Sequence, residues 1–205
     1  MQLKFFCLLG VWLLTSAASA TLKHQDFKLE NGLKLIVQED HRSPVVVVQI
    51  WYRVGSSYEH DGITGVSHAL EHMMFKGTPT YPDGTFSKIV SSNGGLENAF
   101  TSFDYTAYYQ QWAAKNVEKS FELESDRMKN LTLNEDEFSK EINVVLEERR
   151  LRTDDNPQAL ASEIARAATF QTSPYRYPII GWEADIKGMS VDDLKDWYAK
   201  WYSPN

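Results

Sequence analysis

The chain has 205 residues, and its 28 Asp and Glu outnumber 21 Lys and Arg, which gives a formal net charge of −7. This acidic balance, without a cluster of basic residues, argues against nucleic-acid binding, because phosphate contact needs clustered Lys and Arg. The single cysteine, Cys7, lies within the first twenty residues. The remaining sequence therefore has no thiol for a disulfide, a metal or nucleophilic catalysis.

The first twenty residues have the pattern of a secretory signal peptide. Lys4 precedes an unbroken apolar run from Phe5 to Leu14, and Ala18-Ser19-Ala20 forms a small-residue cleavage site. The alternative is a membrane anchor, but ten apolar residues are far fewer than the roughly 20 that cross a bilayer. We therefore expect no stable membrane anchor, and a secreted or periplasmic protein after removal of residues 1–20. Residues 21–205 are enough for one ordinary domain.

The first part of this domain is predicted to form strands followed by two helices. Asn31-Gly32, between short extended segments from Phe27 to Val37, predicts a hairpin turn. The segment Pro44 to Val54 is rich in β-branched and aromatic residues and predicts a buried central strand. Helices are predicted from Val66 to Phe75, ending before Gly77 and Pro79, and from Asp83 to Ser92.

The later sequence changes from strands to helices. Strands are predicted at Leu96–Thr101 and Tyr105–Trp112, and Ser173–Gly181 is predicted to be a loop. Four helices are predicted: Asn116–Leu131, Glu135–Arg152, one after Asn156-Pro157, and Val191–Trp201 with Ser190 as its N-cap. Strands early and helices late predict an α+β fold of two layers, with helices packed on one face of a mainly antiparallel sheet.

The segment His68-Ala-Leu-Glu71-His72 is the main candidate for chemistry. Residues four apart lie one turn above each other on a helix, so His68 and His72 project from one face with Cβ atoms about 5–6 Å apart. This spacing suits two imidazole ligands of one Zn²⁺. Glu71 lies beside them, where it can take a proton from a water on the metal. The alternative is an ordinary solvated helix face, and a catalytic zinc site also needs a third protein ligand.

That third ligand is expected in the glutamate-rich helix downstream. Glu141 and Glu148 are seven residues apart and share a face, whereas Glu147 points about 100° away from Glu148. Glu141 and Glu148 can therefore act together while Glu147 faces elsewhere. The alternative is that all three glutamates belong to a charged surface with the neighbouring arginines.

The linked motifs resemble the pitrilysin/insulinase family of zinc peptidases, which includes the mitochondrial processing peptidases. H-x-x-E-H is the inverzincin signature. The family pattern continues through Met74-Phe75-Lys76-Gly77-Thr78, then through a Gly-x-x-Asn-Ala-x-Thr-x-x-Asp-x-Thr stretch at Gly95 to Thr106, and ends in a Val-Val-x-Glu-Glu helix. The resemblance covers essentially the whole of residues 21–205 and is far more specific than H-x-x-E-H alone.

The resemblance implies a role for particular residues. Glu148, 76 positions after His72, would be the third zinc ligand, so that one Zn²⁺ per chain is held by His68, His72 and Glu148, with Glu71 as general base. Glu141 would support the site without binding the metal itself. The segment Leu96 to Phe100 would be an edge strand to which a substrate peptide adds, with contacts from Asn98, Ala99 and Phe100. The alternative is an ordinary sheet edge.

The implied function is hydrolysis of peptides by a zinc-dependent endopeptidase. In the family that this chain resembles, complete members carry a second half of this lobe and then a further related lobe, and the two lobes close over the peptide. We therefore expect residues 21–205 to be a zinc-binding N-terminal domain truncated at its C-terminal end, with a second peptidase lobe in the same chain or in a partner chain. Two alternatives stay open: a non-catalytic scaffold subunit, and a module that binds peptides without cleaving them.

Overall fold

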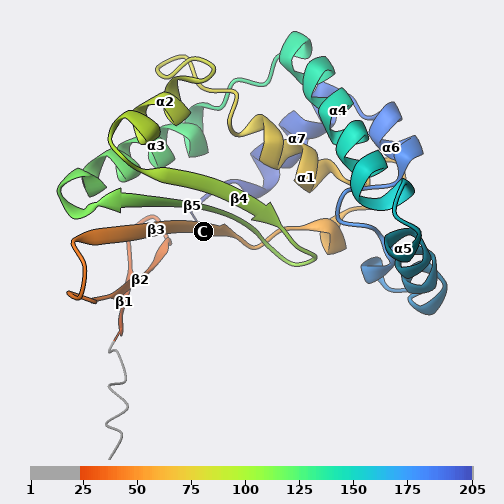
Figure 1. Cartoon of the computed structure of the whole chain (residues 1–205), viewed down its shortest axis with the longest axis horizontal. Coiled ribbons are helices and arrows are strands. Elements are labelled where there is room, and N and C mark those ends of the chain that lie inside the picture. The colour runs from red at the N-terminus through yellow and green to blue at the C-terminus, as the bar shows by residue number, and fades with distance from the viewer. Residues whose placement is uncertain (1–23, 205) are drawn as a thin grey trace, which may run out of the picture.

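A computed structural model of the chain describes residues 24–204, so the predicted signal peptide, residues 1–20, lies outside the described residues. The described part contains two antiparallel sheets (Figure 1). A hairpin of β1 (His24–Lys28) and β2 (Lys34–Gln38) forms the first. The second has the strand order β3-β5-β4, with bounds Val45–Tyr52, Thr106–Ala113 and Leu96–Thr101 respectively.

The predicted hairpin at Asn31-Gly32 is confirmed. Asp26 pairs with Ile36 in the β1–β2 ladder. Gly32 adopts a φ of 91°, which favours glycine, and the Asn31 side chain accepts a hydrogen bond from the Leu33 amide at 3.2 Å. The turn residues thus set the register of the first two strands.

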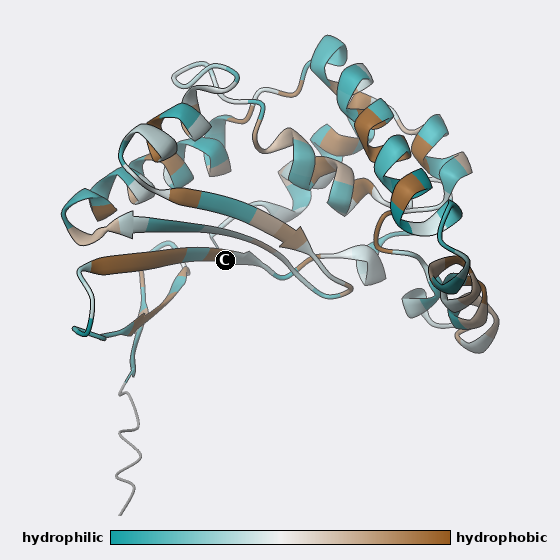
Figure 2. Ribbon diagram, viewed as in Figure 1, coloured by the Kyte–Doolittle hydropathy of each residue, from teal (hydrophilic) through white to brown (hydrophobic). Residues whose placement is uncertain are grey.

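The prediction of a buried central strand at residues 44–54 is wrong in its placement. The strand exists as β3, but β5 occupies the centre of the sheet and β3 lies at an edge. Val45, Val47 and Trp51 are exposed, although the valine run is hydrophobic throughout (Figure 2). Alternate side chains face the helices and end at the buried Tyr52. A short apolar run reads the same at an edge and at a centre, because strand order depends on pairing with distant segments.

Seven α-helices are described among residues 24–204 (Figure 1). Their N-caps include Asn134 and Asn156, and Ser190 forms a capping box with Asp193. Two features differ from the sequence expectations. The helix expected to reach Arg152 becomes a π-helical turn after Arg149, and a short helix follows the predicted loop. The helices are α1 (Val66–Met73), α2 (Thr85–Ser92), α3 (Val117–Asn130), α4 (Glu135–Arg149), α5 (Pro157–Thr169), α6 (Glu183–Gly188) and α7 (Val191–Trp201).

Helix α1 lies at the centre of the helical layer. Leu70 and Met73 of this helix are completely buried, and they share one core with Tyr108 of the sheet and Leu194 of α7. The layer of helices on a mainly antiparallel sheet is the α+β architecture that the sequence predicted. Within residues 24–204, no helix is both long and apolar enough to pass through a bilayer.

Candidate metal centre

Helix α1 begins against a buried carboxylate. Its N-cap is Gly65, which has no side chain to bond the free amides of the first turn. The side chain of Glu59 fills this role: its oxygens accept hydrogen bonds from the amides of Gly65 at 2.7 Å and Ser67 at 2.9 Å. Glu59 therefore fixes the start of the helix that carries His68 and His72.

The structure brings His68, His72 and Glu148 together. One potential ligand atom from each lies within 4.8 Å of the others, and all three side chains are buried or half-buried. The two histidines come from successive turns of α1, and their ring centroids are 4.7 Å apart. Glu148 comes from the last turn of α4, which packs against α1. Two helices far apart in sequence thus supply one cluster of three metal-binding groups.

The two distances from Glu148 to the histidines are close to those of a tetrahedral zinc site. Ligand atoms about 2.0–2.1 Å from a tetrahedral metal are roughly 3.3 Å from each other. The Glu148 Oε2 atom lies 3.2 Å from His72 Nε2 and 3.7 Å from His68 Nε2. Two imidazole nitrogens and one carboxylate oxygen would hold a zinc ion with three protein ligands, which is the number that a catalytic zinc site uses. The residues present therefore fit zinc.

Glu141 holds the far side of the His72 ring. Its Oε1 lies 2.8 Å from His72 Nδ1, and its Oε2 pairs with Lys76 at 2.6 Å. The hydrogen bond with His72 lowers the pKa of Glu141 to about 2. Burial alone would lower the pKa of His72, but hydrogen bonds with Glu141 and Glu148 outweigh it and raise that pKa to about 9. Such a carboxylate on a ligand histidine fixes its tautomer and orientation.

His68 has a different environment. Burial, together with the neighbouring His72, lowers its pKa to about 4, against the opposing charge of Glu148. Its Nδ1 has no hydrogen-bond partner within residues 24–204. The imidazole is thus held in its neutral form, which is the form that binds metals.

Glu71 faces the sheet from the same helix. The Thr101 hydroxyl at the end of β4 donates a hydrogen bond to Glu71 Oε2 at 2.5 Å. Burial raises the pKa of the Glu71 carboxyl, and the Thr101 hydrogen bond works against that rise. Glu71 is therefore anchored to the sheet beside the cluster, rather than being part of it.

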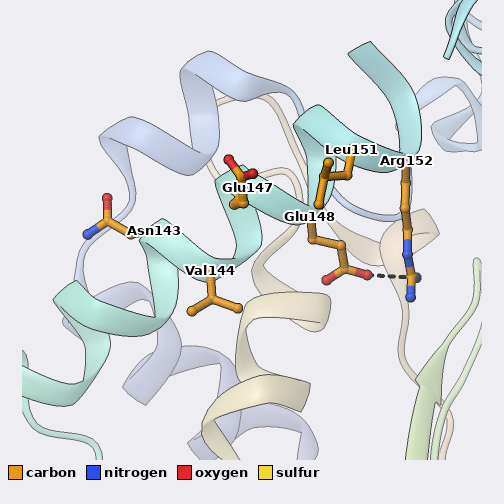
Figure 3. Close-up of a pocket in the computed structure, with 6 residues that line it drawn as sticks. All are labelled: Asn143, Val144, Glu147, Glu148, Leu151 and Arg152. Carbon is orange, nitrogen blue, oxygen red and sulfur yellow. Dashed lines mark ion pairs between the residues drawn. The ribbon is translucent and has the colours of Figure 1, made fainter. Parts of the chain in front are cut away.

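Glu147 and Glu148 point to different sides of α4 (Figure 3). Glu148 Oε1 pairs with Arg152 at 2.6 Å, whereas Glu147 is exposed and pairs with Arg150 at 2.5 Å. A shallow pocket of about 520 Å³ lies along α4, and Glu147 and Glu148 both contribute to its lining. The helical register expected from the sequence is thus the one the structure adopts. The pocket is lined by Asn143, Val144, Glu147, Glu148, Leu151 and Arg152.

Strand β4 forms the other edge of the sheet, and it carries Asn98, Ala99 and Phe100. The Ala99 amide donates a hydrogen bond to the Asn98 side chain at 2.8 Å. Phe100 is partly exposed, and its ring packs edge-on against Trp51 with centroids 5.5 Å apart. Helix α1 packs against this strand. Among residues 24–204, no strand pairs with the outer side of β4, and this edge lies beside the H-x-x-E-H helix.

Several residues that shape the cluster are absent from the sequence expectations. Thr101 lies within the motif from Gly95 to Thr106, so its position carried a signal that was not assigned a role. Arg152 follows Glu148 by one helical turn, which is a readable ion-pair spacing. Glu59 carried no signal, because its contact depends on the loop between residues 59 and 65 folding back onto α1.

An α+β layer that presents an H-x-x-E-H helix beside a glutamate of a second helix is the arrangement of an inverzincin peptidase. Residues 34–183 match the family described as Insulinase (Peptidase family M16). The chain belongs to this family of zinc metallopeptidases.

Individual relatives agree with this assignment. The chain is 39% identical over 189 residues to the zinc protease PqqE of Helicobacter pylori, covering 92% of this chain and 43% of that protein. It is 32% identical to subunit 1 of the mitochondrial cytochrome b-c1 complex of Rattus norvegicus, covering 85% and 36% of the two chains. The chain thus spans less than half the length of these relatives.

Solved structures show the same fold. A protease from Helicobacter pylori superposes with a TM-score of 0.82 at 38% identity, over 89% of this chain and 44% of that chain. The periplasmic protease PqqL from Escherichia coli superposes with a TM-score of 0.81 at 26% identity, over 89% of this chain and 21% of that chain.

Proposed function

We propose that this chain is the zinc-binding part of a metalloendopeptidase, in which His68, His72 and Glu148 hold one Zn²⁺. The observation that carries the proposal is the convergence of these three groups within 4.8 Å, from two helices, with Glu148 3.2 and 3.7 Å from the two histidine nitrogens. Glu141 supports the site through its hydrogen bond with His72. Membership of a peptidase family and 39% sequence identity with the zinc protease PqqE support the same chemistry.

Bound zinc would supply a Lewis acid and lower the pKa of its water to about 7. Glu71 is the residue of the chain that moves the proton: its carboxylate takes it from the attacking water and delivers it to the leaving amine. The Thr101 hydrogen bond keeps one oxygen of Glu71 engaged, so the other oxygen is left for proton transfer. The raised pKa of Glu71 makes it a better proton acceptor once it is ionised.

The substrate is a peptide in extended conformation that adds to strand β4. The free edge at Asn98, Ala99 and Phe100 supports this, because an added strand needs unpaired backbone amides. The Asn98 side chain would turn away from the Ala99 amide to release it. The peptide backbone would then run beside α1, where Glu71 and the histidines lie.

A second peptidase lobe, in the same chain or in a partner chain, would complete the cleft. The 43% coverage of PqqE supports this part of the proposal. A secreted or periplasmic location is supported by the signal-peptide pattern of residues 1–20 and by the likeness to periplasmic PqqL.

A second candidate function is a non-catalytic scaffold or peptide-binding subunit. The 32% identity to a subunit of the cytochrome b-c1 complex, a protein that is not named as a protease, favours it. Hydrolysis of an unstructured peptide by the longest native product that contains this chain separates the two functions. Zinc-dependent cleavage that is lost in Glu71→Gln supports the peptidase. Zinc binding and peptide binding without cleavage support the subunit.

A further inference from the structure

Arg149 follows Glu148 directly but points into the protein. Its side chain is 6% exposed, and its guanidinium donates hydrogen bonds to both oxygens of Glu163 on α5, at 2.8 and 3.0 Å. One of its nitrogens also donates to the Gly181 carbonyl at 2.8 Å. Asp154 lies 3.2 Å away. A residue next to the candidate ligand is thus bonded to a segment 32 positions downstream.

The Gly181 segment rests on the start of α1. A Cβ atom built on Gly65, the N-cap of α1, would lie 2.5 Å from the Ile180 carbonyl oxygen and 2.9 Å from the Gly181 Cα. Gly65 and Gly181 also have positive φ angles of 89° and 93°. The two backbones therefore touch so closely that neither position has room for a side chain, and His68 follows Gly65 by three residues.

Further hydrogen bonds fix the same contact. The Thr64 hydroxyl donates to Asp185 of α6 at 2.5 Å and accepts from the Trp182 amide at 2.9 Å. The segment from residue 181 to residue 185 is thus attached to the loop that precedes α1. Arg149 attaches the end of α4 to the same segment.

We propose that Arg149 is a positioning residue for the metal centre: it fixes Glu148 on α4 relative to His68 on α1. The path runs from Glu148 to Arg149, through the Gly181 carbonyl to Gly65, and along one helical turn to His68. Metal–ligand distances must hold within about 0.2 Å, so two helices that each supply ligands need a fixed spacing. This inference rests on the proposed zinc site.

A purely structural role for Arg149 makes a different prediction. The buried pair with Glu163 would then stabilise the fold without affecting the metal. The double variant Arg149→Met/Glu163→Gln removes both charges together and leaves no buried charge unpaired. A matched control exists one residue away, because Arg150 and Glu147 form an exposed pair from the same region. The control variant is Arg150→Met/Glu147→Gln.

Zn²⁺ affinity is measured by competition with a chelating dye, and the site geometry by the visible spectrum of the Co²⁺-substituted protein. Thermal melting of the metal-free protein reports stability. We expect Arg149→Met/Glu163→Gln to bind Zn²⁺ about 10–100-fold more weakly, as loss of groups that orient ligands typically does, and to show an altered Co²⁺ spectrum. The control should keep the Zn²⁺ affinity within about twofold of wild type and leave the Co²⁺ spectrum unchanged, because its pair is exposed.

Zn²⁺ affinity and Co²⁺ spectrum like those of wild type, with only a lower melting temperature, would overturn the inference. If the double variant does not fold, the Zn²⁺ affinity of the single variant Arg149→Lys tests the inference instead. It keeps the charge, but a single ammonium cannot reproduce the fork that reaches Glu163 and Gly181 together, so weaker Zn²⁺ binding is again expected and unchanged binding overturns the inference. A wild-type protein that binds neither metal would instead reject the proposed function.

Discussion

His72 and Glu141 form the hydrogen bond that organises the candidate metal centre. Glu141 Oε1 lies 2.8 Å from His72 Nδ1, and this leaves His72 Nε2 directed at Glu148 Oε2, 3.2 Å away. The ring therefore has one nitrogen for the supporting carboxylate and one for the metal. The three glutamates of α4 consequently have separable roles.

Glu148→Gln should weaken Zn²⁺ binding severely, because an amide oxygen replaces the carboxylate ligand. Glu141→Gln should weaken it by roughly 10-fold, since the His72 ring loses its charged partner. Glu147→Gln is the control and should leave affinity unchanged, because Glu147 is exposed and pairs with Arg150. Competition with a chelating dye measures all three. A critical Glu147 would show that the assignment of ligands on α4 is wrong.

Glu71→Gln should abolish peptide hydrolysis and spare zinc, because in the proposed mechanism Glu71 accepts a proton beside the cluster and is not a ligand. General acid–base catalysis contributes typically 10²–10⁴-fold, so a loss of at least this size is expected. Metal analysis and peptide turnover are measured on the same preparation. Retained turnover would remove Glu71 from the mechanism, and lost zinc would place it among the ligands.

Glu59 should make the metal-free protein less stable as the pH rises. Burial raises the pKa of its carboxyl from 4.5 to about 7, against the hydrogen bonds from Gly65 and Ser67. The folded state then holds a proton that the unfolded state releases between these two pH values, so the free energy of unfolding falls with pH across this window. A shift of this size corresponds to roughly 3 kcal/mol.

Glu59→Gln cannot ionise, so it removes this dependence. The measurement is the difference in free energy of unfolding between wild type and Glu59→Gln, with a chelator present, from pH 4.5 to pH 7. As the pH rises, the free energy of unfolding of wild type should fall relative to that of Glu59→Gln. The shifted pKa values of His68 and His72 also make stability depend on pH near this range. Their contributions are the same in both proteins, so the difference cancels them. A flat difference would show that Glu59 does not titrate there.

The 205-residue chain alone should hydrolyse an unstructured peptide far more slowly than a longer product that includes a second lobe. It offers the metal centre and one free strand edge, and it spans 43% of PqqE. Holding a substrate in attack geometry can supply about 7–11 kcal/mol of a barrier, and a single wall supplies only part of that. Turnover is compared at matched zinc occupancy. Equal rates would reject the need for a second lobe.

The sequence predicted what depends on local spacing. The i, i+4 histidines, the two-turn spacing of Glu141 and Glu148, and the Asn31-Gly32 turn all follow from the geometry of one element. Other features depend on contacts between segments far apart in the chain: β3 lies at a sheet edge, Gly65 contacts Gly181, and Arg149 points inward. Local pattern does not report such contacts, and so Glu59 and Arg149 were not assigned a role, whereas the cluster and its supporting Glu141 were predicted.

Zinc content directly shows whether His68, His72 and Glu148 hold a metal ion. The purified protein should hold close to one zinc per chain by elemental analysis after dialysis, and His68→Ala or His72→Ala should reduce this to background while the fold, followed by circular dichroism, is retained. Full zinc content in either histidine variant, or no zinc in a folded wild-type protein, would contradict the account.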